Sequence, residues 1–134
     1  MNKPRRIMVI DDSEVLLARI KRALESGGYE VLATAHPVGN ARHLPTCDLV
    51  IIDYHMPGFN GASVLDSLRA IANSLKNECA FYLYTSDSKI AADYTKLGFD
   101  GVFNKGDDEA LLRQVASYFR IRDIKAARRQ RQEA

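Results

Sequence analysis

The stretch IMVIDD, residues 7–12, shows the pattern that decides the fold: a short apolar run that ends in two aspartates. Three later apolar runs are also followed by polar residues: 49–52 by Asp53, 80–84 by Thr85, and 102–103 by Asn104 and Lys105. Continuous apolar runs are typical of strands that are buried on both faces of a parallel sheet. Because an open parallel sheet binds ligands at the carboxyl ends of its strands, the polar residues are predicted to meet at one edge.

Strand and helix patterns alternate along the whole chain. The apolar runs and turn residues predict five strands, at 7–10, 29–35, 49–53, 80–85 and 101–104. Helices are predicted over 13–26, 61–72 and 88–97, and from Asp107 or Asp108 through Phe119, with helical periodicity that persists beyond Ile121. Residues 38–43 form a short helix at most, and 54–59 a loop. The alternation predicts an α/β fold: a three-layer (βα)5 doubly wound parallel sheet.

Length and composition narrow the class of protein. The 134 residues fit one domain with its own core. No apolar run approaches the ~20 residues that a bilayer crossing needs, and the first residues do not form a secretory signal. We therefore expect a soluble, cytoplasmic protein that does not bind membranes. Cys47 and Cys79 lack metal-type spacing and are predicted to be buried, reduced thiols.

The charges are divided unevenly along the chain. Residues 1–119 hold 13 basic and 15 acidic residues (net −2), whereas residues 120–134 hold 6 basic and 2 acidic residues (net +4). A basic end can contact nucleic acid or an acidic partner, but it is more often a solvated helix end. We predict a domain over 1–120 and a basic helical extension or linker over 121–134. A helix of this length could pair with a second copy of the chain, but Arg122 and Lys125 interrupt the apolar heptad seam. Homodimerisation therefore stays open.

The polar strand ends suit phosphoryl chemistry. Asp11, Asp12 and Asp53 would repel one another unless a cation neutralised them, and carboxylate oxygens with room for water suit Mg²⁺. A carboxylate can itself accept a phosphoryl group. The Lys105 ammonium would neutralise charge on the transferred group, and the Thr85 hydroxyl can donate a hydrogen bond to it.

The order of these residues resembles the receiver domain of bacterial two-component response regulators. The motif set is Asp-Asp after strand one, Asp53 followed by Tyr-His-Met-Pro-Gly after strand three, Thr85-Ser86 after strand four, and Lys105 after strand five. The resemblance covers residues 5 to about 120 and implies the flavodoxin-like strand order 2-1-3-4-5. It implies Asp53 as phospho-acceptor and Thr85 and Lys105 as its catalytic partners. It also implies a Mg²⁺ site with Asp12, Asp53 and the backbone carbonyl of His55 as ligands, at which Asp11 acts largely through water.

The resemblance also implies a function. Asp53 would take a phosphoryl group from a sensor histidine kinase or a histidine phosphotransfer protein and lose it by slow self-catalysed hydrolysis. The chain would then be a signalling domain rather than an enzyme, and phosphorylation would switch the face made by strands four and five and the helices after them. That face would bind a downstream protein or an output domain. The sequence after residue 120 shows no recognisable output domain.

Three departures from the family pattern bear on this expectation. Gly106 stands where the family usually has proline, so the loop after Lys105 lacks a conformational lock. Val102 occupies the position of the family's aromatic switch, and the neighbouring Phe103 is predicted to point into the core. His55 and Asp87 are expected to flank the attacking water and to tune the lifetime of the phosphoryl group.

Other readings compete with phosphoryl signalling. The main alternative is a phosphate-independent, receiver-like adaptor that acts by protein–protein interaction. A hydrolase would require Asp-x-Asp after strand one or a Gly-x-Ser-x-Gly elbow, and a dinucleotide or flavin binder a glycine-rich first turn; the sequence has none of these. Nucleic-acid binding is a weaker alternative, and it would depend on residues 120–134 rather than on the domain.

Overall fold

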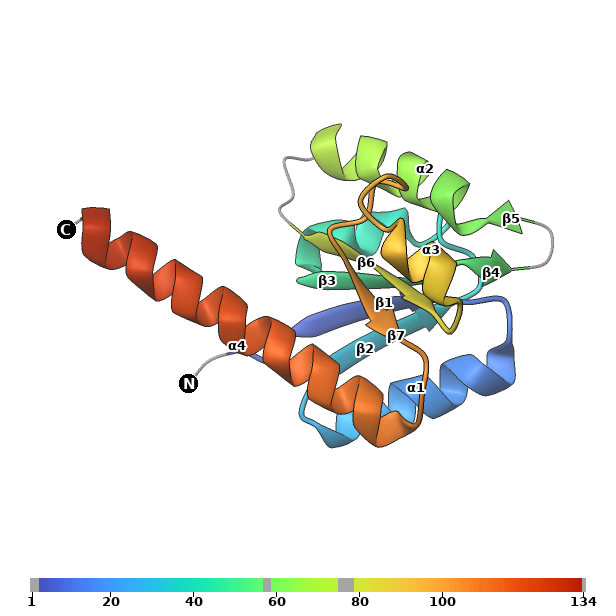
Figure 1. Cartoon of the computed structure of the whole chain (residues 1–134), viewed down its shortest axis with the longest axis horizontal. Helices are drawn as coiled ribbons and strands as arrows, with labels where there is room; N and C mark the ends of the chain where they lie inside the picture. Colours follow the sequence, from blue (N-terminus) through green and yellow to red (C-terminus); the bar gives the residue numbers. More distant parts are fainter. Residues whose placement is uncertain (1–2, 57–58, 75–78, 134) are drawn as a thin grey trace.

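The computed structural model describes residues 3–56, 59–74 and 79–133, and it contains one parallel sheet of five strands. The sheet strands are β1 (Arg6–Ile10), β2 (Glu30–Thr34), β3 (Leu49–Asp53), β6 (Ala80–Thr85) and β7 (Gly101–Asn104). Their order is β2-β1-β3-β6-β7, with every neighbouring pair parallel (Figure 1). Counted along the chain this is 2-1-3-4-5, so the predicted fold class and strand order are confirmed.

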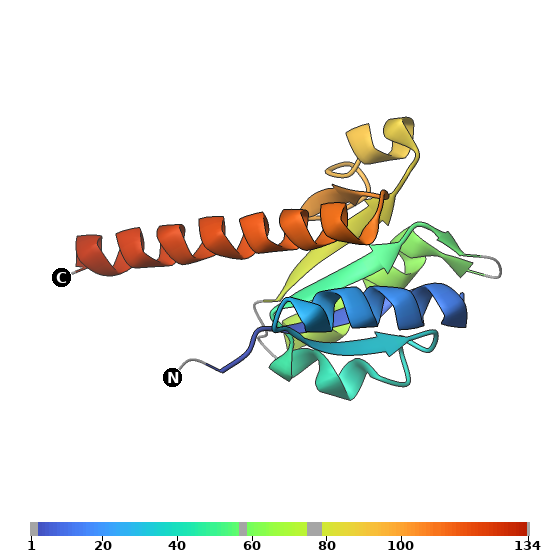
Figure 2. The ribbon, with the colours of Figure 1, turned by 90° about the horizontal axis from the view of Figure 1, so that it is seen from below.

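Helices cover both faces of the sheet and create two apolar cores. Helices α1 (Glu14–Ser26) and α4 (Asp108–Glu133) lie on one face, over Ile7, Val9 and Ile51 (Figures 1 and 2). The 3₁₀ helix η1 (Ala41–Thr46) and helices α2 (Gly61–Ser74) and α3 (Ser88–Ala92) lie on the other. Every residue of β3 is buried, which explains why the four residues before Asp53 form a continuous apolar run rather than an alternating pattern.

Side-chain caps fix where two of the helices begin. The Ser13 hydroxyl accepts a hydrogen bond from the Leu16 backbone N–H at 3.3 Å and caps α1. The Asp87 carboxylate accepts from the backbone N–H groups of Lys89 and Ile90 at 2.9 and 3.2 Å and caps α3. Both caps satisfy N–H groups that the first helical turn leaves without partners.

Three predicted segments differ from the structure. The short helix predicted over 38–43 was misplaced: the helical turns there are 3₁₀ and run from Ala41 to Thr46, with Pro45 inside them. The helix predicted over 88–97 ends at Ala92, because its last turns tighten into i→i+3 bonds such as that from the Tyr94 N–H to the Ala91 carbonyl. The predicted 54–59 loop instead contains the short antiparallel pair β4 (His55–Met56) and β5 (Phe59–Asn60).

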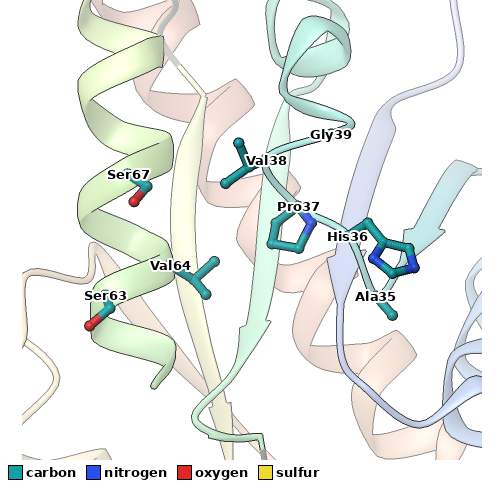
Figure 3. Close-up of a pocket in the computed structure, with 8 residues that line it drawn as sticks. All are labelled: Ala35, His36, Pro37, Val38, Gly39, Ser63, Val64 and Ser67. Atoms are coloured by element: carbon teal, nitrogen blue, oxygen red, sulfur yellow. The ribbon is translucent and has the colours of Figure 1, made fainter. Parts of the chain in front are cut away.

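A groove lies beside α2. The groove has a volume of about 410 Å³ and lies between α2 and residues 35–39, which follow β2 (Figure 3). Figure 3 shows Val64 on α2 and Val38 on the loop pointing toward each other's segment. Val38 is 63% exposed there. The residues that line the groove include none of the aspartates predicted as site residues.

Helix α4 continues well beyond the sheet (Figure 1). Its middle is tied to the domain by an ion pair between Arg5 and Asp123 and by a 3.0 Å hydrogen bond from Arg122 to the Asp48 carbonyl. Ile121 and Ile124 are 53% and 46% exposed. The helix passes through residue 121 without a break, and the functional division proposed there stays a prediction. None of the helices in the described ranges combines the length and apolarity that a bilayer crossing requires.

A side chain pairs with one residue at the outer edge of β7. The Gln114 side chain on α4 accepts a hydrogen bond from the Asn104 N–H at 3.0 Å and donates one to the Asn104 carbonyl at 3.1 Å. The amide therefore pairs with Asn104 as a neighbouring strand would. It also fixes the backbone directly before Lys105.

Both cysteines are free and buried, as predicted. Burial raises the pKa of the Cys79 thiol from 9.0 to about 11, and the neighbouring Cys47 adds to the effect. The folded state thus favours the protonated thiol: the resulting stabilisation is complete below pH 9 and is lost as the pH rises to 11. We expect a loss of about 3 kcal/mol in this window.

The measurement is urea unfolding at several pH values for the wild type and for Cys79→Ala. Three tyrosines also lower stability in alkali, because loss of solvent raises the pKa of the buried Tyr84 and of the half-buried Tyr82 and Tyr118. They contribute equally to both proteins, so the difference between the two profiles isolates Cys79. Parallel profiles would contradict the prediction.

Candidate functional site

The carboxyl ends of the sheet strands bring the predicted aspartates together. Asp11 and Asp12 follow β1, and Asp53 ends β3. Carboxylate oxygens from all three lie within 4.8 Å of one another. Asp11 and Asp53 are only 2% and 4% exposed, so their charges are poorly solvated. A cluster of this kind is unfavourable by itself and favours a bound cation.

Asp11 supplies the clearest sign that the cluster fits a metal ion. Its Oδ1 accepts a hydrogen bond from the Ser13 N–H at 3.1 Å. Its Oδ2 is buried and, within the described part of the chain, has no hydrogen-bond partner. A buried carboxylate oxygen without a donor is costly unless a cation meets it. The all-oxygen donor set suits Mg²⁺, which prefers carboxylates and retains several waters.

Asp12 completes the cluster at its more exposed side. Its pKa is raised, first by partial loss of solvent and then by the neighbouring Asp11 carboxylate, whereas the more distant Lys105 ammonium lowers it. Loss of solvent and the Asp11 carboxylate thus both disfavour the ionised form of Asp12. A divalent cation between the aspartates would reverse the effect.

Lys105 reaches the same cluster from β7. Its Nζ lies 2.9 Å from Asp53 Oδ1, and the two side chains are 27% and 6% exposed. Its backbone N–H donates to the Thr85 carbonyl at 2.9 Å, which extends the pairing of β6 and β7 past the last strand residue. The predicted cation and the predicted acceptor are therefore in direct contact.

Thr85 ends β6 and is only 1% exposed. Its Oγ1 accepts a hydrogen bond from the Asp87 N–H at 3.1 Å. Asp87 in turn caps α3 through its carboxylate. A short chain of hydrogen bonds thus connects the Thr85 hydroxyl to the first turn of α3. The role predicted for Asp87 beside the attacking water stays a prediction.

Two predicted features fall partly outside the described residues. His55 is the first residue of β4, but its side chain is not described, and its carbonyl as a metal ligand stays a prediction. Pro57 and Gly58 of the Met-Pro-Gly motif lie outside the described ranges.

Val102, at the position of the family's aromatic switch, and its neighbour Phe103 face opposite sides of the sheet. Phe103 is 3% exposed and packs against Tyr82 with ring centroids 4.5 Å apart, so the prediction that it points into the core is confirmed. Val102 is half-buried and packs on the opposite face of the sheet, against the core beneath α2 and α3.

Two residues near the lysine were not identified from the sequence: Tyr84, which contacts Lys105, and Gln114, which holds the end of β7 before Lys105. The Tyr84 ring lies under Lys105, with Nζ 5.4 Å from its centroid, and Gln114 holds the backbone of Asn104. An aromatic residue directly before Thr85 was the available signal for Tyr84. The Gln114 contact depends on the docking of α4, which no local pattern reveals.

Comparison with known proteins agrees with the fold described above. The family model described as Response regulator receiver domain matches residues 7–117. The chain is 39% identical over 71 residues to the sensory/regulatory protein RpfC of Xanthomonas campestris pv. campestris, a match that covers 52% of this chain and 10% of RpfC. It is 37% identical over 73 residues to the transcriptional regulatory protein PrrA of Mycobacterium tuberculosis, with 52% and 31% covered.

These matches span a tenth and just under a third of the two curated relatives. Among solved structures, the chemotaxis protein CheY4 of Vibrio cholerae has a TM-score of 0.73 at 20% identity, covering 86% of this chain and 98% of that one. At this identity the likeness shows the fold alone.

Proposed function

The chain belongs to the response regulator receiver domain family, and from this premise we propose that Asp53 accepts a phosphoryl group and thereby switches a partner-binding face. The donor would be a sensor histidine kinase or a histidine phosphotransfer protein. The observation that carries the proposal is the 2.9 Å contact of Lys105 with Asp53 beside the cluster of Asp11, Asp12 and Asp53. The family is one of signalling domains, and phosphoryl gain and loss on its own aspartate would be the only chemistry of this chain.

The positions of the side chains support the following chemistry. A carboxylate oxygen of Asp53 attacks the phosphorus, the P–N bond to the donor histidine breaks, and the imidazole leaves with the electron pair and takes up a proton. Lys105 moves from the Asp53 carboxylate to a phosphoryl oxygen, and the Thr85 hydroxyl donates to another. Mg²⁺ held by Asp11, Asp12, Asp53 and the His55 carbonyl would supply positive charge against the same oxygens.

The switch would use the hydrogen bonds between Thr85, Asp87 and α3. If Thr85 turns toward the phosphoryl group, its Oγ1 withdraws from the Asp87 N–H, and the capped start of α3 must respond. Lys105 carries the change to β7. We propose that the resulting face of β6, α3, β7 and α4 binds a downstream protein or an output domain. Homodimerisation stays an open question.

The functional unit is proposed to be the receiver domain at residues 1–120, with residues 121–134 as a basic helical extension or linker. The exchange with a histidine kinase implies the cytoplasm of a bacterium as its setting. A phosphate-independent adaptor is the second candidate, because Val102 and Gly106 stand where the family has an aromatic residue and proline.

The test is intact-mass spectrometry after incubation with acetyl phosphate and Mg²⁺. We expect one phosphoryl adduct that disappears when the metal is chelated. With beryllofluoride, the amide resonances of α3, β7 and the first turns of α4 should shift. Neither an adduct nor beryllofluoride binding would refute phosphoryl acceptance and favour the adaptor. Binding without any shift in residues 85–120 would refute the proposed face.

A further inference from the structure

The aromatic ring beneath Lys105 has no place in the phosphoryl chemistry of Asp53, Thr85 and Lys105. Lys105 Nζ lies over the Tyr84 ring at 5.4 Å from its centroid, within the ~6 Å at which a cation is attracted to an aromatic face. We propose that Tyr84 is a positioning residue for Lys105: its ring holds the ammonium group in the site while the lysine exchanges the Asp53 carboxylate for a phosphoryl oxygen. This inference depends on the proposed phosphoryl transfer.

Strand register explains how the two side chains meet. Tyr84 on β6 pairs with Phe103 on β7. Lys105 lies two residues after Phe103, so alternation returns it to the sheet face that carries Tyr84. Tyr84 is only 4% exposed and is packed in the core beneath α1 and α4. Its ring is therefore a fixed surface, whereas the lysine chain above it is long and partly exposed.

An aromatic face suits a lysine that changes partners. The ring attracts the ammonium through its quadrupole and offers no acceptor atom that must be released when the hydrogen bond moves. A second carboxylate at this place would instead compete with the phosphoryl group for the lysine. The ring thus restrains Nζ without opposing the exchange.

The restraint matters because the residue directly after Lys105 is a glycine. Gly106 leaves the next backbone dihedrals free. The backbone before it is held by the Lys105 N–H bond to the Thr85 carbonyl and by Gln114 on Asn104. These bonds fix the start of the side chain but not its end. Asp53 and Tyr84 hold the end, and Tyr84 continues to hold it when the lysine leaves Asp53. The site therefore has substitutes for the lock that proline would give.

The direct test is the NMR signal of the Lys105 ε-CH2 group, assigned by its loss in Lys105→Met. In the wild type and in Tyr84→Phe, the ring should move this signal upfield of the other lysine signals. In Tyr84→Leu the upfield shift should disappear. A Lys105 signal that coincides with those of the exposed lysines in the wild type would overturn the inference, whether or not the protein accepts phosphate.

The functional test is a double-mutant cycle on the rate of phosphorylation by acetyl phosphate. Tyr84→Phe should react within about twofold of the wild type, and Tyr84→Leu about fivefold more slowly. In a Lys105→Met background, Tyr84→Leu should cost nothing further. An equal cost in both backgrounds would assign Tyr84 to packing only and overturn the inference. A wild type without any adduct would instead refute the proposed function, and the NMR result would still decide on Tyr84.

Discussion

Asp53→Asn is expected to abolish the phosphoryl adduct that the wild type forms with acetyl phosphate and Mg²⁺. An amide is a poor nucleophile and cannot form the acyl phosphate, so we expect the rate to fall by about 10³-fold or more, below detection. Asparagine has the size of aspartate, and Asp53 is only 4% exposed, so the packing around it should survive. Intact-mass spectrometry of both proteins, with circular dichroism to confirm folding, measures the effect.

The matched control is Asp66→Asn. It makes the same chemical change on an exposed residue of α2 and should leave the adduct unchanged. An adduct that persists in Asp53→Asn would contradict the assignment and place the acceptor on another group. Peptide mapping would then identify it, with Asp11 and Asp12 as the nearest carboxylates.

Asp11→Asn is expected to change metal binding and stability in opposite directions. Asparagine keeps the acceptor for the Ser13 N–H, and it replaces the unpartnered Oδ2 by a donor that can face the other carboxylates. Removing one of three clustered charges should raise the free energy of unfolding without metal by about 1–2 kcal/mol. The same loss of charge should weaken Mg²⁺ binding by about 30-fold or more.

Isothermal titration calorimetry with Mg²⁺ and urea unfolding in chelator measure the two effects separately. Asp66→Asn again serves as the control and should change neither by a comparable amount. A metal-free protein that becomes less stable in Asp11→Asn would show that Asp11 is needed for the turn into α1 rather than for a cation. Unchanged Mg²⁺ affinity would remove Asp11 from the ligand set.

The sequence predicted those parts of the fold that depend on local patterns. Continuous apolar runs defined the sheet strands, and strand alternation placed Phe103 in the core. The polar residues after the strands met as expected, because the carboxyl ends of parallel strands share one edge. Asp11, Asp12, Asp53 and Lys105 could therefore be grouped before any coordinates were known.

The errors arose where tertiary packing decides between similar local structures. Whether 88–97 continues as a helix after Ala92 depends on contacts that its weak periodicity does not reveal. The 3₁₀ turns at Ala41–Thr46 fit a segment that contains Pro45, but their start was shifted from the predicted one. The Tyr84–Lys105 contact joins two side chains from different strands, and the Gln114 side chain on α4 pairs with the Asn104 backbone. Finding either contact requires the strand register or the docking of α4.

The Gln114 amide on Asn104 has a consequence for how this protein can meet others. β7 is an outer strand of the sheet, and its free backbone groups would otherwise template the addition of another chain's strand, the first step toward fibrils. With Asn104 paired to a side chain, alternation leaves Val102 as the other residue whose backbone points outward. Strand addition at this edge is thereby disfavoured, because an incoming strand would have to displace Gln114 from Asn104.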